Sequence, residues 1–223
     1  MNAFRRILKT KIKLLLGRGV YKSYSQFGED IVVQSLLRNV KDGIYVDVGA
    51  FDPVLYSNTY HFYKKGWHGL VIDPNPELTK RYAFLRPRDI FINCGISDKN
   101  GELTYYSFNM PAYNTFDADE KDAYLASNSK LKLVNTRSVK LKTLEETLRE
   151  HKIQHIDFLS VDVQGMDLQV LMSLGSIQPS IIAVEDESFD TERPDTSEIY
   201  RYLKSKSYTL KGLSGLTTTW KKK

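Results

Sequence analysis

Residues 43–53 read Gly-Ile-Tyr-Val-Asp-Val-Gly-Ala-Phe-Asp-Pro, and this stretch decides the fold of the chain. Its apolar run, residues 44–48, stops at Gly49, and a helical pattern begins near Ser57, which predicts a strand, a tight turn and a helix. In α/β sheets such a turn presents backbone N–H groups to nucleotide-like ligands. Gly49 would let the backbone approach a ligand, and Asp47 stands just before the turn. The alternative is a plain strand-to-helix turn with a packing glycine.

A second apolar strand, residues 70–72, ends in Asp73, which follows Gly49 by 24 residues. An acidic side chain at this distance, at the tip of the next strand, is placed to accept hydrogen bonds from a ribose diol. The phosphate-binding pattern G-x-G-x-x-G is absent, because Phe51 and Val54 occupy its second and third glycine positions. The sequence therefore argues against a dinucleotide and favours a nucleoside ligand such as S-adenosylmethionine (SAM).

The composition is that of a globular chain with one α/β domain. Its 223 residues, 41% of them hydrophobic and 26% charged, suffice for one complete core. Cys94 is the only cysteine, which excludes a disulfide framework and a cysteine-based zinc site and makes a reducing cytoplasmic location the expected one. No stretch approaches 18 apolar residues, and neither a membrane span nor a secretory signal is expected.

The positive charge is concentrated at the two ends of the chain. Residues 1–22 contain seven lysines and arginines and no acid, residues 221–223 are lysines, and the rest of the chain carries a net charge of −5. A basic body that could follow phosphates is missing, so no nucleic-acid partner is expected. Residues 3–16 have the pattern of a basic amphipathic helix. This pattern predicts either peripheral contact with the inner membrane face or packing on the body or on a partner protein.

The remaining chain alternates between strand and helix patterns. Strands are expected near 44–48, 70–72, 89–93, 156–162, 179–184, 208–211 and 216–220, and helices near 25–39, 60–65, 77–86, 144–151, 167–174 and 196–206. This alternation predicts a doubly wound, mostly parallel sheet in a domain of residues 23–220, preceded by the basic segment 1–22. Residues 102–108 alternate like an added antiparallel strand, and residues 109–135 are expected to form a long loop.

Several segments taken together resemble one family. They are 24–30 (Tyr-Ser-Gln-Phe-Gly-Glu-Asp), 45–50 (Tyr-Val-Asp-Val-Gly-Ala), 57–59 (Ser-Asn-Thr), 66–69 (Gly-Trp-His-Gly), 72–76 (Ile-Asp-Pro-Asn-Pro) and 159–167 (Leu-Ser-Val-Asp-Val-Gln-Gly-Met-Asp). In this order and spacing, the chain is similar to the FkbM family of SAM-dependent methyltransferases over roughly residues 24–211. The resemblance implies the Rossmann-like class I methyltransferase fold, a mostly parallel seven-stranded sheet with an antiparallel final strand. It also implies methylation of hydroxyl groups on sugars or secondary metabolites.

The resemblance further suggests roles for single residues. The residues expected to bind SAM are Gln26, Asp47, Gly49, Asn58, Asp73 and Ser97. Asp47 and Gly49 match the first SAM motif, and Asp73 matches the acid that binds the ribose. Gln26 and Asn58 lie in matching segments that border the site, whereas Ser97 follows the third expected strand.

Transfer of a methyl group to a hydroxyl needs a base or a divalent metal, because an alcohol does not ionise unaided at neutral pH. Asp162, at the end of the fourth parallel strand, is the first candidate for the base, and His61 is the second. Asp162, Glu185 and Asp186 could instead hold Mg²⁺ or Mn²⁺ through their oxygens. The family commonly has glutamate where this chain has Gln164, so a role of that position as base or metal ligand is in question.

The leading interpretation is an O-methyltransferase acting on a sugar hydroxyl of a glycan or small-molecule acceptor. The aromatic-rich segment 109–116, with Tyr113 and Phe116, could close over a sugar ring, or it could pack on the body. The alternative interpretation, which Gln164 keeps open, is a scaffold of the same fold. Such a scaffold would bind SAM or another nucleoside, or be tethered to a membrane, without turnover.

Overall fold

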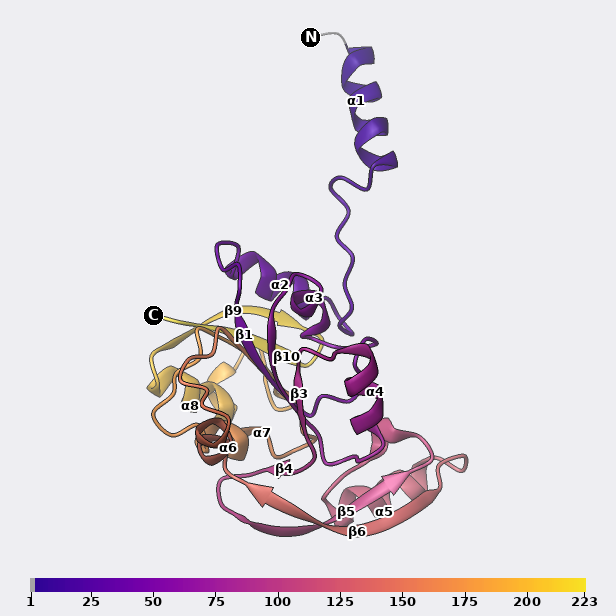
Figure 1. Ribbon diagram of the computed structural model, residues 1–223, viewed down its shortest axis with the longest axis vertical. Coiled ribbons are helices and arrows are strands. Elements are labelled where there is room, and N and C mark those ends of the chain that lie inside the picture. Colours follow the sequence, from indigo (N-terminus) through magenta and orange to yellow (C-terminus); the bar gives the residue numbers. More distant parts are fainter. Residues whose placement is uncertain (1–2) are drawn as a thin grey trace.

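The computed structural model describes residues 3–223, and a seven-stranded sheet lies at their centre (Figure 1). Its order is β3-β2-β1-β7-β8-β10-β9, and β10 runs in the direction opposite to the other described strands of this sheet, pairing antiparallel with both β8 and β9. The strands are β1 (Ile44–Val48), β2 (His68–Ile72), β3 (Ile90–Ile92), β7 (Phe158–Val161), β8 (Ile181–Glu185), β9 (Tyr208–Ser214) and β10 (Thr217–Lys222). The predicted mostly parallel sheet with an antiparallel final strand is confirmed.

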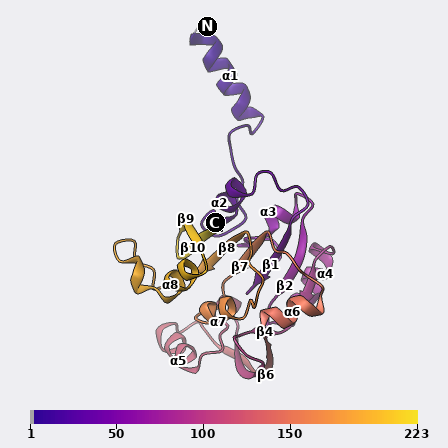
Figure 2. The same ribbon diagram turned by 90° about the vertical axis from the view of Figure 1, so that its left-hand side faces the viewer.

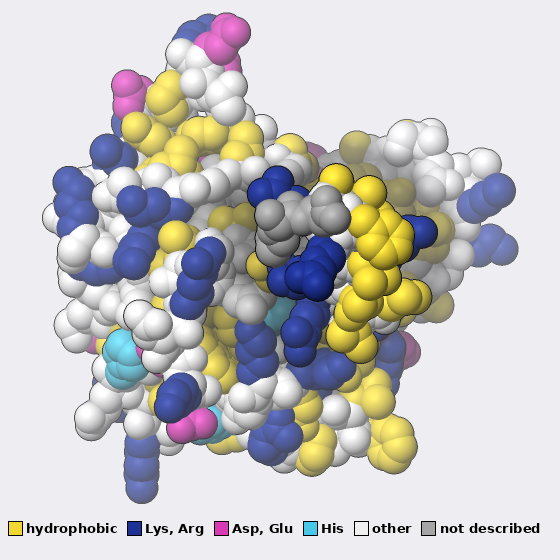
Figure 3. Space-filling model, turned by 90° about the horizontal axis from the view of Figure 1, so that it is seen from above, with side chains coloured by type: hydrophobic (Ala, Val, Ile, Leu, Met, Phe, Trp, Pro, Cys, Tyr) yellow, Lys and Arg dark blue, Asp and Glu magenta, His cyan; other side chains and the backbone are white. Residues whose placement is uncertain are grey.

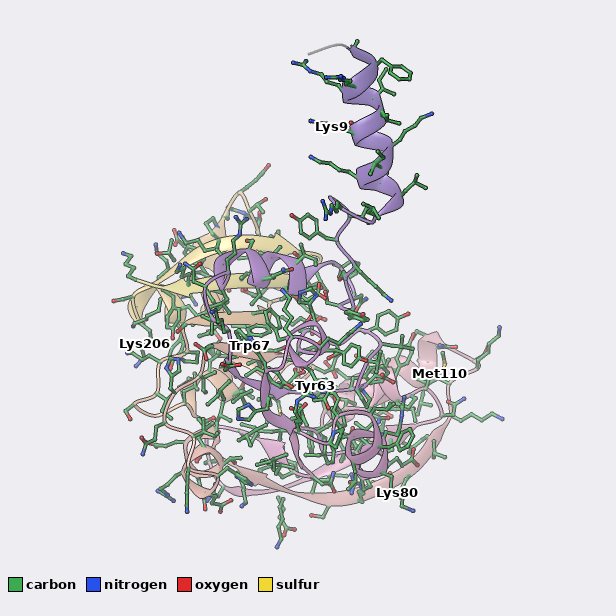
Figure 4. The ribbon with its side chains drawn as sticks, turned by 45° about the horizontal axis from the view of Figure 1, so that its top comes forward. Lys9, Tyr63, Trp67, Lys80, Met110 and Lys206 are labelled. Atoms are coloured by element: carbon green, nitrogen blue, oxygen red, sulfur yellow. The ribbon has the colours of Figure 1, made fainter. Side chains whose placement is uncertain are left out.

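Helices pack on both faces of this sheet (Figures 1 and 2). One face carries α2 (Glu29–Leu36), α3 (Tyr60–Tyr63) and α4 (Leu78–Leu85), and the other carries α6 (Leu144–Glu150), α7 (Asp167–Met172) and α8 (Glu198–Ser205). Side chains of β1 alternate between the two layers, because Tyr45 belongs to the first core and Val46 to the second. Tyr63 and Trp67, labelled in Figure 4, also belong to the first core.

A second, three-stranded sheet is inserted between β3 and α6 and lies at the bottom of Figure 1. Its order is β4 (Gly95–Ile96), β6 (Leu133–Lys142) and β5 (Gly101–Phe108). The predicted antiparallel strand at 102–108 is confirmed as β5, although its partner is β6 and not a strand of the main sheet. Between β5 and β6 lie a short 3-10 helix, η1 (Pro111–Tyr113), and a helix, α5 (Ala118–Ser127).

The prediction of a loop over residues 109–135 is wrong from residue 118 onwards, where α5 forms and β6 later begins. Asp117 caps α5, because its side chain accepts hydrogen bonds from the backbone N–H groups of Asp119 and Glu120. In the described structure, α5 buries none of its residues. The helix therefore lacks the apolar stripe from which a packed helix is predicted in a sequence.

Two helix starts show how local hydrogen bonds place the elements. Thr143 caps α6 as the sequence predicts, and it accepts a hydrogen bond from the Glu146 N–H at 3.2 Å. The predicted start of α2 at Ser25 is wrong, because the helix begins only after Gly28, whose φ is 87°. The Ser25 hydroxyl instead lies 3.0 Å from the Asp30 carboxylate and accepts from the Asp30 N–H at 3.2 Å, which braces the turn before the helix.

The helix α1 (Ala3–Leu15) extends away from the rest of the molecule (Figures 1 and 2). In the described structure, none of its residues is buried. Among the helices of residues 3–223, none is both long enough and apolar enough to cross a lipid bilayer. The predicted helix at 3–16 is confirmed, whereas its contact with a membrane or a partner stays a prediction.

Candidate active site

A cavity of about 480 Å³ lies where the carboxyl ends of β1, β2, β7 and β8 meet. Parallel strands end on the same edge of a sheet, so residues far apart in the sequence come together there. The predicted site residues that line this cavity are Gln26, Asp47, Gly49, Asn58, Asp73, Asp162 and Glu185. The inserted sheet and the segment after β5 complete the wall with Tyr105, Asn114 and Phe116, among others.

Asp47 reaches the cavity from β1, and only 5% of the residue is exposed. Its carboxylate accepts a hydrogen bond from the Thr59 hydroxyl at 2.5 Å. Burial raises the pKa of Asp47, while the Arg86 guanidinium and hydrogen bonds from Thr59 and Ser160 oppose that rise. Asp47 is therefore part of a buried polar network as well as a candidate cofactor ligand.

At the centre of this network is Arg86, a residue that no sequence motif marks and whose guanidinium is fully buried. It forms an ion pair with Asp89, Nε to Oδ2 at 2.6 Å, and it donates to the hydroxyls of Thr59 at 2.9 Å and Ser57 at 3.2 Å. Because Thr59 in turn donates to Asp47, the turn after β1 is tied to the loop after α4. The spacing of Arg86 and Asp89 is a weak sequence signal, because charge pairs three residues apart are also common on exposed helices.

Gly49 occupies a position that accepts no other residue. Its φ is 82°, and a Cβ atom placed on it would lie 1.7 Å from the backbone carbonyl oxygen of Asp162. The close approach of the ends of β1 and β7 therefore requires glycine. Close packing of the two strand ends therefore explains why this position is glycine, and Gly49 also lines the cavity.

Asp73 follows β2, is 7% exposed and lies in the cavity wall. The Asn75 N–H donates to its carboxylate at 2.7 Å, and the Asn93 amide donates to its backbone carbonyl at 2.9 Å. Burial raises the pKa of Asp73 to about 7; the Asn75 hydrogen bond opposes the rise and the charge of Asp47 adds to it. A ligand that donates hydrogen bonds to this carboxyl group would favour its ionised form.

A second polar group, Asp162, Gln164 and Glu185, stands at the ends of β7 and β8. The Gln164 amide donates to Asp162 Oδ1 at 3.2 Å and to Glu185 Oε2 at 3.3 Å. The φ of Gln164 is 52°, a left-handed conformation that is uncommon outside glycine. A glutamate here would present only acceptors to its two neighbours when ionised, so the glutamine supplies donors that the usual residue of the family lacks.

Asp162 and Glu185 also bond to each other through a shared proton. Burial raises the pKa of Asp162, although the hydrogen bond from Glu185 lowers it. In Glu185, burial and then the charge of Asp162 raise the pKa to about 8. Asp162 is exposed to solvent on its cavity side. Protein atoms surround it on the other sides, and this surrounding protein raises its pKa. Near neutral pH, Glu185 holds the proton and Asp162 accepts it.

Of the predicted metal ligands Asp162, Glu185 and Asp186, only the first two come together in the cavity wall. Asp186 turns towards the start of α8, where its carboxylate accepts hydrogen bonds from Ser197 at 2.5 Å and Ser188 at 2.8 Å. Within the described chain, no group of three or more His, Cys, Asp or Glu side chains is arranged to hold an ion. The described residues therefore do not fit the predicted Mg²⁺ or Mn²⁺ site.

The predicted residues His61 and Ser97 are not among those that line the cavity in the described chain. His61 lies on α3 with its ring edge-on to Phe62 at 5.5 Å, and burial lowers its pKa. Ser97 follows β4, which leaves the main sheet to join the inserted one; its hydroxyl donates to Asp98 at 3.2 Å. Their catalytic and cofactor roles stay predictions that the geometry does not support.

Comparison with known proteins gives a family and a set of similar structures. The profile of the methyltransferase FkbM domain matches residues 47–210. A search among curated proteins gave no match. Among solved structures, a TehB-like SAM-dependent methyltransferase from Corynebacterium glutamicum aligns over 98% of this chain and 97% of its own, with 9% identity and a TM-score of 0.44.

Two further solved structures are similar at the same distant level. A 1,6-didemethyltoxoflavin-N1-methyltransferase from Burkholderia thailandensis, with its namesake compound and S-adenosylhomocysteine bound, aligns over 98% of this chain and 88% of its own, at 13% identity and a TM-score of 0.43. A precorrin-6y C5,15-methyltransferase from Geobacter metallireducens aligns over 86% of this chain and 88% of its own, at 14% identity and a TM-score of 0.39.

The sheet order and its antiparallel strand define the class I methyltransferase fold, and the cavity lies at the strand ends of this fold. Because the family profile covers most of its length, the chain belongs to the FkbM methyltransferase family. The cofactor of this class is SAM, and the residues present fit it. The buried carboxyl group of Asp73 faces the cavity, where it can accept hydrogen bonds from a ribose diol, and the turn at Gly49 lies in the same wall.

Proposed function

We propose that this methyltransferase acts on a hydroxyl group, and that the acceptor is a sugar of a glycan or of a glycosylated metabolite. The observation that carries the proposal is the hydrogen-bonded pair of Asp162 and Glu185 in the cavity wall. A hydroxyl group must lose its proton as the new bond forms, and a carboxylate in this position can accept that proton. The lone buried thiol of Cys94 is compatible with a reducing, cytoplasmic setting.

Asp162 is the residue that would accept the proton. Glu185, protonated near neutral pH, and the Gln164 amide both donate hydrogen bonds to it, and these bonds fix its orientation. Because an ionised carboxylate offers about four lone-pair positions, Asp162 keeps acceptor capacity towards the cavity. When bound, SAM supplies an electrophilic methyl group on a sulfonium. The task of the protein residues is to orient the acceptor oxygen and to hold its proton at Asp162.

The wall formed by the inserted sheet supports a sugar as the acceptor. Tyr105 and Phe116 pack with ring centroids 4.9 Å apart, and both line the cavity. Aromatic faces suit the apolar side of a sugar ring. Asn114 also lines the cavity; its Oδ1 accepts from the backbone of β5 at 2.8 Å. Its amide group has two N–H donors, so one can bond the Tyr105 hydroxyl and the other an acceptor hydroxyl. Tyr113, predicted to act with Phe116, packs against Tyr124 instead.

Transfer of label from SAM to matched acceptor panels tests the proposal. One panel contains nucleotide sugars and oligosaccharides, and the other contains their amino-sugar counterparts. Label is expected on hydroxyl oxygen, and Asp162→Asn is expected to lower kcat by roughly 10²- to 10⁴-fold, the usual contribution of a general base. Exclusive labelling of nitrogen would show that the acceptor class is wrong.

The matched control is Glu192→Gln, which neutralises an exposed carboxylate in the segment between β8 and α8 and should leave kcat unchanged. SAM affinity should stay within a few-fold in both variants, because neither residue is expected to hold the cofactor. Full turnover by Asp162→Asn would remove the residue from proton transfer. SAM binding by the wild type without transfer to any acceptor would favour the non-catalytic scaffold.

A further inference from the structure

The helix α1 carries a continuous apolar side that the described structure leaves uncovered. Its members recur at helical spacing, and between 46% and 86% of each is exposed: Phe4, Ile7, Leu8, Ile12 and Leu15. Seen from above in Figure 3, hydrophobic side chains form a band along one side of the helix. An exposed apolar surface of this kind marks a site of contact with a partner or a membrane.

The opposite side of α1 is basic. Arg5, Arg6, Lys9 and Lys13 fall together on a helical projection, and lysine and arginine side chains flank the apolar band in Figure 3. Figure 4 labels Lys9 on this side. Lys11 falls within the apolar side, where its long stem can lie along apolar surface while the ammonium group reaches outwards. The absence of any acid from residues 1–22 gives the segment one sign of charge throughout.

A helix of this length gains little stability by itself. α1 has 13 residues, and isolated helices shorter than about 12–15 residues are marginal in water. The other α-helices of the described chain, except α5, bury apolar side chains, whereas α1 buries no residue although it carries an apolar side. An external surface is therefore needed to cover its apolar side.

We propose that α1 docks the enzyme on the surface of an anionic lipid bilayer. The apolar side would enter the boundary of the acyl chains, and the basic side would lie among the anionic headgroups. Charge complementarity favours an anionic lipid surface, because residues 1–22 contain seven lysines and arginines and no acid. A neutral apolar groove of a partner protein would not require this excess of positive charge. The helix, about 20 Å long, lies on such a surface and is too short to span a hydrocarbon core of about 30 Å.

The chain places the catalytic cavity close to the docked helix. Gln26 lines the cavity and follows the end of α1 at Leu15 by 11 residues. Even a fully extended connection of that length spans no more than about 40 Å. The proposal itself does not depend on the acceptor, because α1 contributes no residue to the cavity.

Co-sedimentation of the full-length protein with vesicles tests the proposal. Vesicles of phosphatidylcholine alone are compared with vesicles of equal parts phosphatidylcholine and phosphatidylglycerol. The protein is expected to sediment with the anionic vesicles and to be released at high salt, because salt screens the headgroup attraction. Reversing Arg5, Arg6, Lys9 and Lys13 to glutamate should weaken binding on the order of a hundredfold or more.

The matched control reverses the same number of charges on exposed lysines elsewhere in the chain. They are Lys80, Lys99, Lys132 and Lys140. This control should sediment like the wild type, which separates local attraction from a general effect of net charge. A second variant, Ile7→Ser with Leu8→Ser and Leu15→Ser, should abolish binding through loss of the apolar side. SAM binding, measured in parallel, should be unchanged in all variants and reports that the domain is folded.

Three results would overturn the proposal. The first is equal sedimentation with neutral and anionic vesicles, and the second is unchanged binding after reversal of the α1 charges. The third is a protein that stays in the supernatant as an oligomer, which Ile7→Ser with Leu8→Ser converts to a monomer. In that case a second copy of the chain, and not a lipid surface, covers the apolar side.

Discussion

The two halves of the cavity wall differ in how deeply their residues are buried. The half at the ends of β1 and β2 rests on the sheet and on buried groups, with Asp47 5%, Asp73 7%, and Thr59 and Arg86 0% exposed. The half formed by the inserted sheet rests on elements that bury fewer side chains. In the described structure η1 and α5 bury none, and most residues of β5 and β6 are exposed or half-buried, although β5 buries Tyr105 and Phe108. Under the proposed function, the core half binds the cofactor and the half formed by the inserted sheet binds the acceptor.

This difference has a physical basis. A cofactor site that must keep one geometry gains from buried ion pairs and close strand packing, because these leave few alternative arrangements. An acceptor wall on exposed elements can change its side chains at little cost to the core, since exposed substitutions usually have small effects on stability. We therefore expect substitutions in the cofactor half to affect folding and SAM affinity, and substitutions in the acceptor half to affect acceptor use.

The largest effect is expected from Arg86→Met. The change would leave Asp89 buried beside Tyr45 without its ion-pair partner, and loss of one partner of a buried pair costs about 3–5 kcal/mol. The free energy of unfolding, measured with urea, should fall by that amount. The turn that Thr59 and Ser57 hold should also loosen, so SAM affinity should fall in the same variant.

The chain offers a matched control in Arg81, which pairs with Asp52 in the same half of the cavity. The Arg81 side chain is 52% exposed, so Arg81→Met should cost about 0–1 kcal/mol. Equal losses of stability in the two variants would show that burial does not set the contribution of these ion pairs, and the physical basis given for the cofactor half would fail.

The same contrast explains which parts of the molecule the sequence predicts. The sequence predicts the parallel strands and the cofactor half of the site. Apolar runs mark the strands, and Asp47, Gly49, Asp73 and Asp162 lie at strand ends that meet at one edge of the sheet. The sequence does not predict the helix α5, because this helix buries no apolar stripe. Periodicity reports burial, so exposed elements leave a weak signal.

Three residues in or near the site show what the sequence alone could not predict. Glu185 and Asp186 are neighbours in the sequence, but successive residues at a strand end point to opposite faces. Glu185 therefore lines the cavity, whereas Asp186 accepts a hydrogen bond from Ser197 at the start of α8. Arg86 lies outside every motif, and only the fold brings it under Thr59. The sequence predicted which strand ends form the site, and side-chain direction and the buried support required the structure.

In the cofactor half, Asp73→Ala should weaken SAM binding by about 1–3 kcal/mol, the cost of lost hydrogen bonds to a charged group. Calorimetry with SAM measures this change. The control Asp122→Ala removes a 70% exposed carboxylate from α5 and should leave the affinity unaltered. Unchanged affinity in Asp73→Ala would place the ribose elsewhere and separate the cofactor from this half of the wall.

The pH dependence of SAM binding sharpens the same assignment. The pKa of Asp73 is raised to about 7 in the folded protein without ligand, so the group is largely protonated below neutral pH. Binding of a ribose diol needs the carboxylate, so affinity should fall as pH falls, by about tenfold between pH 8 and pH 6. In Asp73→Asn this dependence should disappear. A persistent slope in that variant would assign the titration to another group.

Stability of the protein without ligand should change with pH in the opposite direction. An acid whose pKa is higher in the folded than in the unfolded state stabilises the fold below its ordinary pKa near 4, and this contribution is lost as pH rises towards 7. Urea unfolding of the wild type and of Asp73→Asn, compared between pH 5 and pH 8, isolates the contribution of Asp73. A wild type that gains stability relative to the variant over this interval would contradict the raised pKa.

The smallest effect is expected in the acceptor half, from Phe116→Leu. The substitution removes an aromatic pair with Tyr105, worth about 0.5–1.5 kcal/mol, and one aromatic face of the cavity. Because the residue stands on the peripheral wall, KM for the acceptor should rise several-fold while SAM affinity stays constant. Phe84→Leu on α4, where the ring is 84% exposed, controls for loss of an aromatic side chain and should change neither value. If Phe116→Leu weakened SAM and spared the acceptor, the two halves of the wall would have to exchange the roles assigned to them.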